Sequence, residues 1–381
     1  MRLVPTTTLP EGALLARDVL VGRPDGVPLL RAGVAITPDY RSRLLRVGIR
    51  AVYIEDELGA GIAPQALIST ETRQAATRLV ADAFHAAGEA MLAKQLMPLK
   101  TIASLQEIVK QILADVASSA GAAMALVDLA AADTYTFQHS IDVTALGLLL
   151  GERMFRERGW LDFRGVRQFH RLDERLHMLG LGLLLHDVGK LALPGKLIQK
   201  PEKLTPDEWE LIRSHPRLGL ELLRGDDFSP LVKAIVLRHH ERWDGSGYPD
   251  GKRGTEIHEM ARIAAVADVY DAITSERPYA AAQPAREGVR VILEGSGTLF
   301  DPDVVDVFAR VVTPFPPGEE LRLADGRRAV VVSVPEEALH RPLVRVIEGP
   351  GAPYELALVH EPALTIDGWG PDVSTAAAAA A

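Results

Sequence analysis

Residues 179–190 read LGLGLLLHDVGK, an apolar run that ends in a histidine, an aspartate and a lysine. At helical spacing, His186 and Lys190 fall on the same face as the preceding leucines, one turn apart at the inner surface. Polar groups buried without partners are strongly unfavourable. The segment therefore predicts a helical protein whose apolar core contains a polar site.

Four further histidines occur in similar surroundings. They are His139 in HSIDV, His215 in HPRLG, and the adjacent pair His239 and His240 in LRHHERWDG. We expect each of these segments to lie on a helix, with the imidazoles on the face that packs into the core. One buried histidine alone is more often satisfied by a backbone carbonyl than by a metal.

Two aspartates make metal binding the favoured interpretation of these histidines. Asp187 follows His186 directly, and Asp268 lies among alanines in ARIAAVADVYDAITS. Five histidines and two aspartates are too many donors for one ion of ordinary coordination number, but they suit two ions that share a bridging carboxylate, for which Asp187 is the natural candidate. Two such ions can activate a shared hydroxide, which predicts phosphoester hydrolysis.

The composition limits the class of protein. The 381 residues contain no cysteine, so nitrogen and oxygen are the strong metal ligands available. A formal net charge of -9 argues against binding to nucleic-acid polymers. No apolar stretch reaches the roughly 18 residues of a membrane span, and the first residues lack a signal-peptide pattern. We therefore expect a cytoplasmic protein without a membrane span.

The chain divides by pattern into a mainly α protein with small β-rich units at both ends, α+β overall. Strands are expected in LARDVLV, VPLLRAGVAIT and GIRAVYIED, with a helix around Pro38 to Val47, and two long helices joined near Pro98 should follow. Near the C-terminus, LRLADGRRAVVVSV predicts a hairpin with an Asp-Gly turn, followed by strands in PLVRVIEG and LALVHEPALTI. The predicted units are a mixed β unit over 1–62, a helical linker over 63–130, the catalytic domain over 131–310, a β unit over 311–369 and a tail over 370–381.

The segments HDVGK, LPGKLIQKPEKLTPDEWELIRSHPRLG, HHERWDGSGYP and ARIAAVADVYDAITSERPY resemble, in this order, the HD-GYP subgroup of the HD phosphohydrolases. The resemblance covers residues 131–310. Linked motifs of this length are far more specific than the dipeptide HD. The resemblance implies a catalytic domain built as an HD-type helical bundle, and small β modules similar to the two end units accompany such domains.

The resemblance also implies roles for individual residues. Asp187 and Lys190 would be catalytic, with Lys190 in contact with the scissile phosphate. Substrate would also be bound by Arg277 of SERPY and by the GYP element, which consists of Gly247, Tyr248 and Pro249. The first metal would be held by His139, His186, Asp187 and Asp268, and the second by Asp187, His215, His239 and His240.

The implied reaction is hydrolysis of cyclic di-GMP to linear pGpG, with further cleavage to GMP left open, through a hydroxide that bridges two divalent ions, iron or manganese. The expected partners are cyclic di-GMP, other signalling proteins through the GYP loop, and a second copy of the chain through the helical linker. Two alternatives remain: a phosphohydrolase for another cyclic dinucleotide or nucleotide, or a slow HD-GYP module that acts by binding.

Three features depart from the family pattern. Tyr135 occupies the position of a Glu that helps to hold a third metal in some members, which predicts two ions here. Ala280 replaces a basic residue after RPY, so one phosphate contact is missing. The segment between His139 and His186 is longer than expected and contains FRERGWLDFRGVRQFHRLDER, for which a solvated loop is favoured over a lid or a partner surface.

Overall fold

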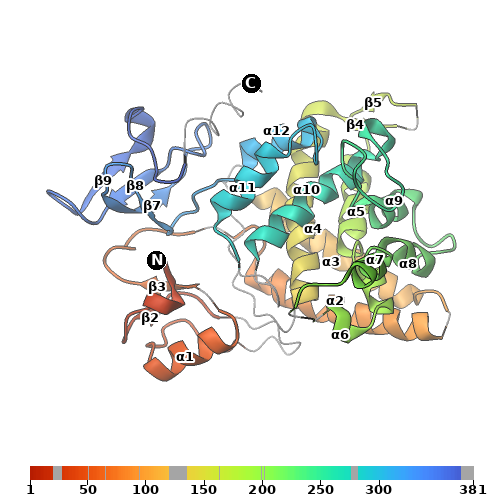
Figure 1. Ribbon diagram of the computed structural model, residues 1–381, viewed down its shortest axis with the longest axis horizontal. Helices are drawn as coiled ribbons and strands as arrows, with labels where there is room; N and C mark the ends of the chain where they lie inside the picture. The colour runs from red at the N-terminus through yellow and green to blue at the C-terminus, as the bar shows by residue number, and fades with distance from the viewer. Residues whose placement is uncertain are drawn as a thin grey trace.

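A computed structural model of the chain shows a helical body with two small β units on one side of it (Figure 1). It describes residues 1–369 except for 20–27, 50, 65, 94, 120–134, 163, 199, 201 and 276–281. The predicted fold class, mainly α with small β-rich units at the ends, is confirmed. Among the described residues, no helix combines the length and apolar character needed to cross a membrane.

The N-terminal unit is a small antiparallel sheet with one helix. Strands β1 (Arg2–Pro5), β3 (Ala51–Glu55) and β2 (Leu14–Leu15) pair in that order, and η1 (Thr6–Thr8) follows β1. Helix α1 (Pro38–Arg46) begins at proline after Thr37, whose side chain accepts a hydrogen bond from the Tyr40 amide. The expected helix is confirmed. The expected strand VPLLRAGVAIT is wrong over 28–37, where the chain forms only isolated bridges.

Two long helices form the linker, as predicted. Helix α2 (Thr70–Leu92) is capped by Ser69, and α3 (Leu99–Ser118) starts directly after Pro98. Ala76, Val80 and Phe84 lie one helical turn apart on α2 and are fully buried. Helix α2 packs against α3, against α4 (Tyr135–Arg158) and against the short 3₁₀ helix η3 (Val188–Ala192). The linker helices and the helices that follow them therefore share one apolar core.

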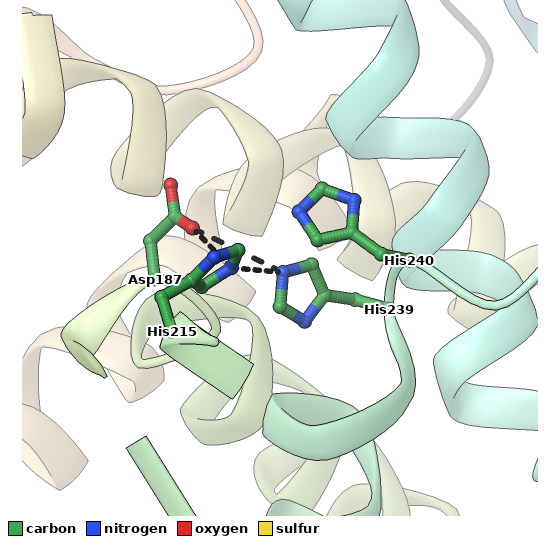
Figure 2. Close-up of side chains that lie close together, drawn as sticks. All are labelled: Asp187, His215, His239 and His240. Carbon is green, nitrogen blue, oxygen red and sulfur yellow. Dashed lines mark hydrogen bonds and ion pairs between the residues drawn. The ribbon is translucent and has the colours of Figure 1, made fainter. Parts of the chain in front are cut away.

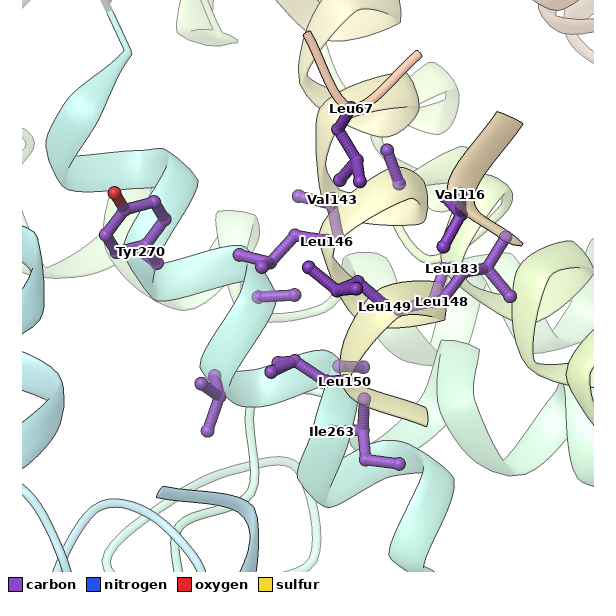
Figure 3. Close-up of a cluster of buried hydrophobic side chains, with 14 of the residues drawn as sticks. Leu67, Val116, Val143, Leu146, Leu148, Leu149, Leu150, Leu183, Ile263 and Tyr270 are labelled. Atoms are coloured by element: carbon purple, nitrogen blue, oxygen red, sulfur yellow. The ribbon is translucent and has the colours of Figure 1, made fainter. Parts of the chain in front are cut away.

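Helix α4 lies at the centre of the helical bundle. It packs against α5 (Leu172–Leu184) and α10 (Glu259–Thr274), and Figure 3 shows Leu146, Leu149 and Leu150 of α4 among the buried side chains of the neighbouring segments. The remaining helices of the bundle are α6 (Gly195–Ile198), α7 (Pro206–Ile212), α8 (His215–Leu222), α9 (Pro230–Arg238), η4 (Gly254–Glu256), α11 (Ala285–Glu294) and α12 (Pro302–Val311).

The long segment between α4 and α5 is not simply a solvated loop. It forms a short hairpin of β4 (Trp160–Leu161) and β5 (Arg167–Gln168). Glu259, buried at the start of α10, accepts hydrogen bonds from the Leu161 amide at 2.7 Å and from Arg167 at 3.3 Å. These contacts anchor the hairpin to the bundle, although Val166 and Phe169 remain exposed on it.

The C-terminal unit is a four-stranded antiparallel sheet. Its strands β6 (Glu320–Arg322), β7 (Arg328–Ser333), β8 (Leu343–Val346) and β9 (Tyr354–Ala357) pair in chain order, and Gly326 has a positive φ of 91° in the expected Asp-Gly turn. The expectation that LALVHEPALTI is a strand is wrong beyond Ala357, where η5 (Leu358–His360) begins: the Leu358 amide donates to the Pro342 carbonyl at 3.2 Å, and the Leu358 side chain is buried.

The two β units differ in how they join the bundle. Apolar residues of the C-terminal sheet belong to the same continuous core as the bundle, whereas the N-terminal unit has a separate core. The two units also touch each other. The Leu3 amide donates to the Gly318 carbonyl at 2.8 Å, and Arg345 donates to the Leu58 and Ala60 carbonyls at 2.9 and 2.8 Å.

Candidate metal centre

Seven side chains predicted from the motifs converge in the bundle, in two adjacent donor groups. Their ligand atoms lie within 4.8 Å of one another inside each group. We call His139, His186 and Asp268 the first donor group, and Asp187, His215, His239 and His240 the second donor group.

In the first donor group, His139 projects inward from α4 and is 2% exposed. Its Nε2 atom lies 3.2 Å from Asp268 Oδ1 and 3.3 Å from His186 Nε2. Its other ring nitrogen, Nδ1, lies 2.6 Å from Asp271 Oδ2. A carboxylate behind a histidine fixes the ring orientation and raises its basicity, which is a common arrangement around metal-binding histidines.

His186 and Asp187 do not lie on a helix, so that expectation is wrong. Helix α5 ends at Leu184, and Lys190 lies in η3. At the end of this helix, the Leu183 carbonyl accepts a hydrogen bond from the His186 side chain at 2.6 Å. Beyond it, Gly189 passes so close to α8 that a Cβ atom there would lie 1.9 Å from the His215 carbonyl oxygen.

In the second donor group, His215 is the first residue of α8, while His239 is the C-cap of α9 and His240 follows it in a turn. The helical placement expected for His239 and His240 is therefore wrong as well: their rings turn inward from the end of α9. Figure 2 shows His215 and His239 pointing toward Asp187, with His240 beside them. His215 Nε2 lies 3.2 Å from His239 Nε2 and 3.3 Å from Asp187 Oδ1.

Backbone carbonyls determine which nitrogens of these rings face the centre. Nδ1 of His186, His215 and His239 lies 2.6, 2.8 and 3.0 Å from the carbonyls of Leu183, Ile212 and Val236, respectively. A carbonyl only accepts, so each Nδ1 carries the proton and a neutral ring presents its Nε2 lone pair to the centre. Two lone pairs that face each other at about 3.2 Å repel unless a cation lies between them.

Asp187 connects the two donor groups and provides the test of whether metal ions fit. Its Oδ1 atom faces His215 and His239, while its Oδ2 atom lies 3.5 Å from His186 Nε2 and 3.7 Å from His139 Nε2. The Oδ1 atom is fully buried and accepts no hydrogen bond from the residues that the structure describes. A buried carboxylate oxygen without a hydrogen bond, surrounded by convergent nitrogen lone pairs, fits a divalent cation.

The two donor groups differ in electrostatic character. Burial disfavours the charged ring of His139, but the hydrogen bonds that its ring donates to the carboxylates of Asp268 and Asp271 raise its pKa to about 9. In the second donor group, burial lowers the pKa of His215 to about 4 and that of His240 to about 3. Burial opposes ionisation of Asp187, but the Lys190 ammonium holds the pKa of its carboxyl well below the ordinary value.

Lys190 reaches the centre from η3. Its Nζ atom lies 2.5 Å from Asp187 Oδ2, and its side chain is 26% exposed. The ammonium group therefore lies between the buried carboxylate and solvent, where an incoming phosphate would meet it. Arg277, the other predicted phosphate contact, lies outside the described residues, as does Ala280; of Tyr135, only its position at the start of α4 is described.

The GYP element packs directly on the second donor group. The ring of Tyr248 stacks on that of His240, with centroids 4.7 Å apart and an interplanar angle of 26°. A Cβ atom on Gly247 would lie 2.5 Å from the His240 carbonyl oxygen, so this close approach requires glycine. Glu241, 2% exposed, accepts from the amides of Asp250 and Lys252 at 2.8 and 3.0 Å and thereby holds the loop in place.

Two residues that support the centre, Asp271 and Glu241, were not among the predicted site residues. Asp271 lies one turn after Asp268 on α10, and this spacing was a usable signal for a second inward carboxylate. Glu241 directly follows the histidine pair. Arg213, within the quoted segment that precedes His215, was not predicted as a site residue either, because its position over the Tyr248 ring appears only in three dimensions.

Comparison with known proteins supports the resemblance seen in the motifs. Residues 167–304 match the family model of the HD domain, and the predicted resemblance to HD-GYP proteins is confirmed. The chain is 39% identical over 245 residues to the cyclic di-GMP phosphodiesterase PA4108 of Pseudomonas aeruginosa, covering 64% of this chain and 55% of that protein.

Two further relatives match shorter segments. The cyclic di-GMP phosphodiesterase response regulator RpfG of Xanthomonas campestris is 46% identical over 140 residues, covering 36% of this chain and 37% of that protein. The 3'3'-cGAMP-specific phosphodiesterase 2 of Vibrio cholerae is 37% identical over 125 residues, covering 32% of this chain and 24% of that protein. The chain thus spans about half the length, or less, of these curated relatives.

Proposed function

We propose that this chain is a metal-dependent phosphodiesterase that hydrolyses cyclic di-GMP to linear pGpG. The observation that carries the proposal is the convergence of two donor groups on the shared carboxylate of Asp187. The similarity to proteins named cyclic di-GMP phosphodiesterases supports the choice of substrate.

The proposed ligands are those predicted from the motifs: His139, His186, Asp187 and Asp268 for one divalent ion, and Asp187, His215, His239 and His240 for the other. When bound, two such ions would activate water for attack and neutralise charge on the phosphate. Iron or manganese suits this set of nitrogen and oxygen donors. Tyr135 supports a count of two ions, since it offers no carboxylate.

The chain's own residues have defined tasks in this reaction. Asp187 holds both halves of the centre together, and Lys190 places a positive charge where the negative charge of the phosphoryl group grows. Tyr248 and Gly247 shape the wall beside His240. Arg277 would bind a phosphate through its planar guanidinium group. The 3′ oxygen leaves and takes up a proton, which yields the linear product.

A second candidate substrate is 3′3′-cGAMP, because relatives specific for that dinucleotide also match the chain at 34 to 37% identity. One experiment tests both. Protein purified anaerobically is analysed for metal content and assayed with cyclic di-GMP, 3′3′-cGAMP and nucleotide monophosphates. Two iron or manganese ions per chain with turnover of cyclic di-GMP to pGpG is the expected result. Protein that holds these metals but cleaves none of the cyclic dinucleotides contradicts the proposal and favours the slow binding module.

A further inference from the structure

Arg213, between α7 and α8, lies at the edge of the metal centre. Its guanidinium carbon lies 4.7 Å from the centre of the Tyr248 ring, and that ring also stacks on His240. The three side chains are therefore connected by ring contacts from the second donor group to Arg213. A guanidinium group over an aromatic face is held by cation–π attraction and keeps its N–H edges available for other partners.

The centre opens on the side of this stack. The side chain of His240 is 24% exposed, whereas those of His215, His239 and Asp187 are at most 2% exposed. Arg213 is 33% exposed. A substrate that reaches the second donor group past His240 therefore passes the guanidinium group of Arg213.

The present partner of Arg213 is a weak one. Within the described part of the chain, its ion pair is with Glu210 at 2.9 Å, and Glu210 is 70% exposed. Exposed pairs of this kind contribute little and exchange readily for other anions. Its neighbours Arg217 and Arg238 differ, because both pair with Asp250 of the GYP loop, at 2.8 and 3.5 Å.

We propose that Arg213 binds the second, non-scissile phosphate of the substrate and so selects a cyclic dinucleotide over a simple phosphodiester. The proposal rests on the proposed phosphodiesterase function. A cyclic dinucleotide carries two phosphates, and only one can lie at Lys190 and the donor groups. Arg213 supplies a planar, charged donor for the other, at the position where the substrate leaves the buried part of the site.

The test compares two substrates on three variants. Cyclic di-GMP has two phosphates, and bis(p-nitrophenyl) phosphate has only the scissile one. Arg213→Gln should raise KM for cyclic di-GMP about ten-fold, with kcat within about two-fold and a shallower salt dependence, and should leave hydrolysis of bis(p-nitrophenyl) phosphate unchanged. Arg213→Lys should recover part of the loss.

Arg310→Gln on α12 is the matched control. Arg310 is 38% exposed and pairs with Glu157 and Asp306, so the variant loses the same charge at similar exposure and should keep the wild-type KM. Calorimetric binding of cyclic di-GMP to chelator-treated protein gives a readout that does not depend on turnover, and Arg213→Gln should weaken it about ten-fold.

The outcomes separate the two proposals. If wild-type protein cleaves cyclic di-GMP and Arg213→Gln has unchanged KM, the role of Arg213 is refuted while the phosphodiesterase function stands. Equal impairment on both substrates also refutes it, because Arg213 would then act through the position of Tyr248. Wild-type protein that neither cleaves nor binds cyclic di-GMP overturns both.

Discussion

The two donor groups lie side by side but obtain their support in different ways. In the first, a carboxylate lies behind one of the two histidines: Asp271 is 2.6 Å from His139, and Asp268 faces that ring from the other side, whereas His186 contacts the Leu183 carbonyl. In the second, the Nδ1 atoms of His215 and His239 donate to backbone carbonyls, and Asp187 supplies the negative charge. Carboxylate support raises the pKa of His139 to about 9, whereas burial lowers the pKa of His215 to about 4.

This difference predicts which kind of substitution should disrupt each donor group. The first donor group depends on side chains of α10, which can be replaced one at a time. The second depends on the backbone course of α8 and α9, so packing errors should damage it most. Asp187 contacts both donor groups, so its replacement should disrupt both of them.

Asp187→Ala should have the largest effect. Both donor groups lose their shared carboxylate, so we expect turnover to fall by at least about 1,000-fold and metal content to fall with it. Metal analysis and a cyclic di-GMP assay on one preparation measure this. His85→Ala, at an exposed histidine of α2, should leave both unchanged. Near wild-type activity with full metal in Asp187→Ala would show that Asp187 is no bridge.

Gly189→Ala should disturb the second donor group by displacing the backbone that positions it. The new methyl group would overlap the His215 carbonyl and the Gly219 amide, so η3 or α8 must move. We expect a loss of about 3 kcal/mol in the free energy of unfolding, measured with denaturant, together with a loss of activity. Gly195→Ala meets no atom within 4 Å and serves as the control. Equal stability of the two variants would mean that η3 and α8 are not in close contact.

Asp271→Leu should weaken the first donor group alone. His139 loses the acceptor that orients its ring, and metal affinity should drop about 10- to 100-fold at one of two sites. Titration with metal after chelation should then resolve one tight and one weak ion. Asp271→Asn, which keeps an acceptor oxygen, should lie closer to wild type. Two equally weakened ions would show that Asp271 supports the centre as a whole.

Glu241→Ala should have the smallest effect of the four and should leave both donor groups filled. The amides of Asp250 and Lys252 lose their acceptor, at a cost of about 1–3 kcal/mol, and the GYP loop loosens over His240. KM for cyclic di-GMP should rise several-fold while metal content stays constant. Glu256→Ala, which removes an exposed acceptor in η4, provides the comparison. A loss of metal in Glu241→Ala would mean that the loop also holds the ligands.

The sequence predicted the donors better than their supports, for a physical reason. Each donor lies in a short motif whose polar residue interrupts an apolar run, and such an interruption is visible locally. The partner of His139 is 132 positions away, and the aromatic stack under Arg213 joins segments that only the fold brings together. Long-range contacts of this kind leave no periodic signal.

The helical periodicity also gave a wrong prediction at the end of α5. Continuing the pattern of α5 through His186 to Lys190 ignores the close approach of Gly189 to α8, which forces the chain into a tighter turn. Helix α1 was predicted from Pro38 to Val47 and is observed over Pro38–Arg46, and the two linker helices were predicted to join near Pro98, directly after which α3 begins. Local signals thus located these helices, whereas the end of α5 coincides with a tertiary contact.

Because the two β units are attached differently, they differ in whether they can be separated from the helical bundle. The apolar side chains of the N-terminal unit, from Val4 to Ile54, form a closed set, so a junction after residue 62 leaves two intact interiors and a few polar contacts to Gly318 and Arg345. A junction at residue 311 would instead expose Phe308 and Leu323, which share one interior. The N-terminal unit can therefore be exchanged as a separate domain, whereas the C-terminal sheet must stay together with the helices that share its core.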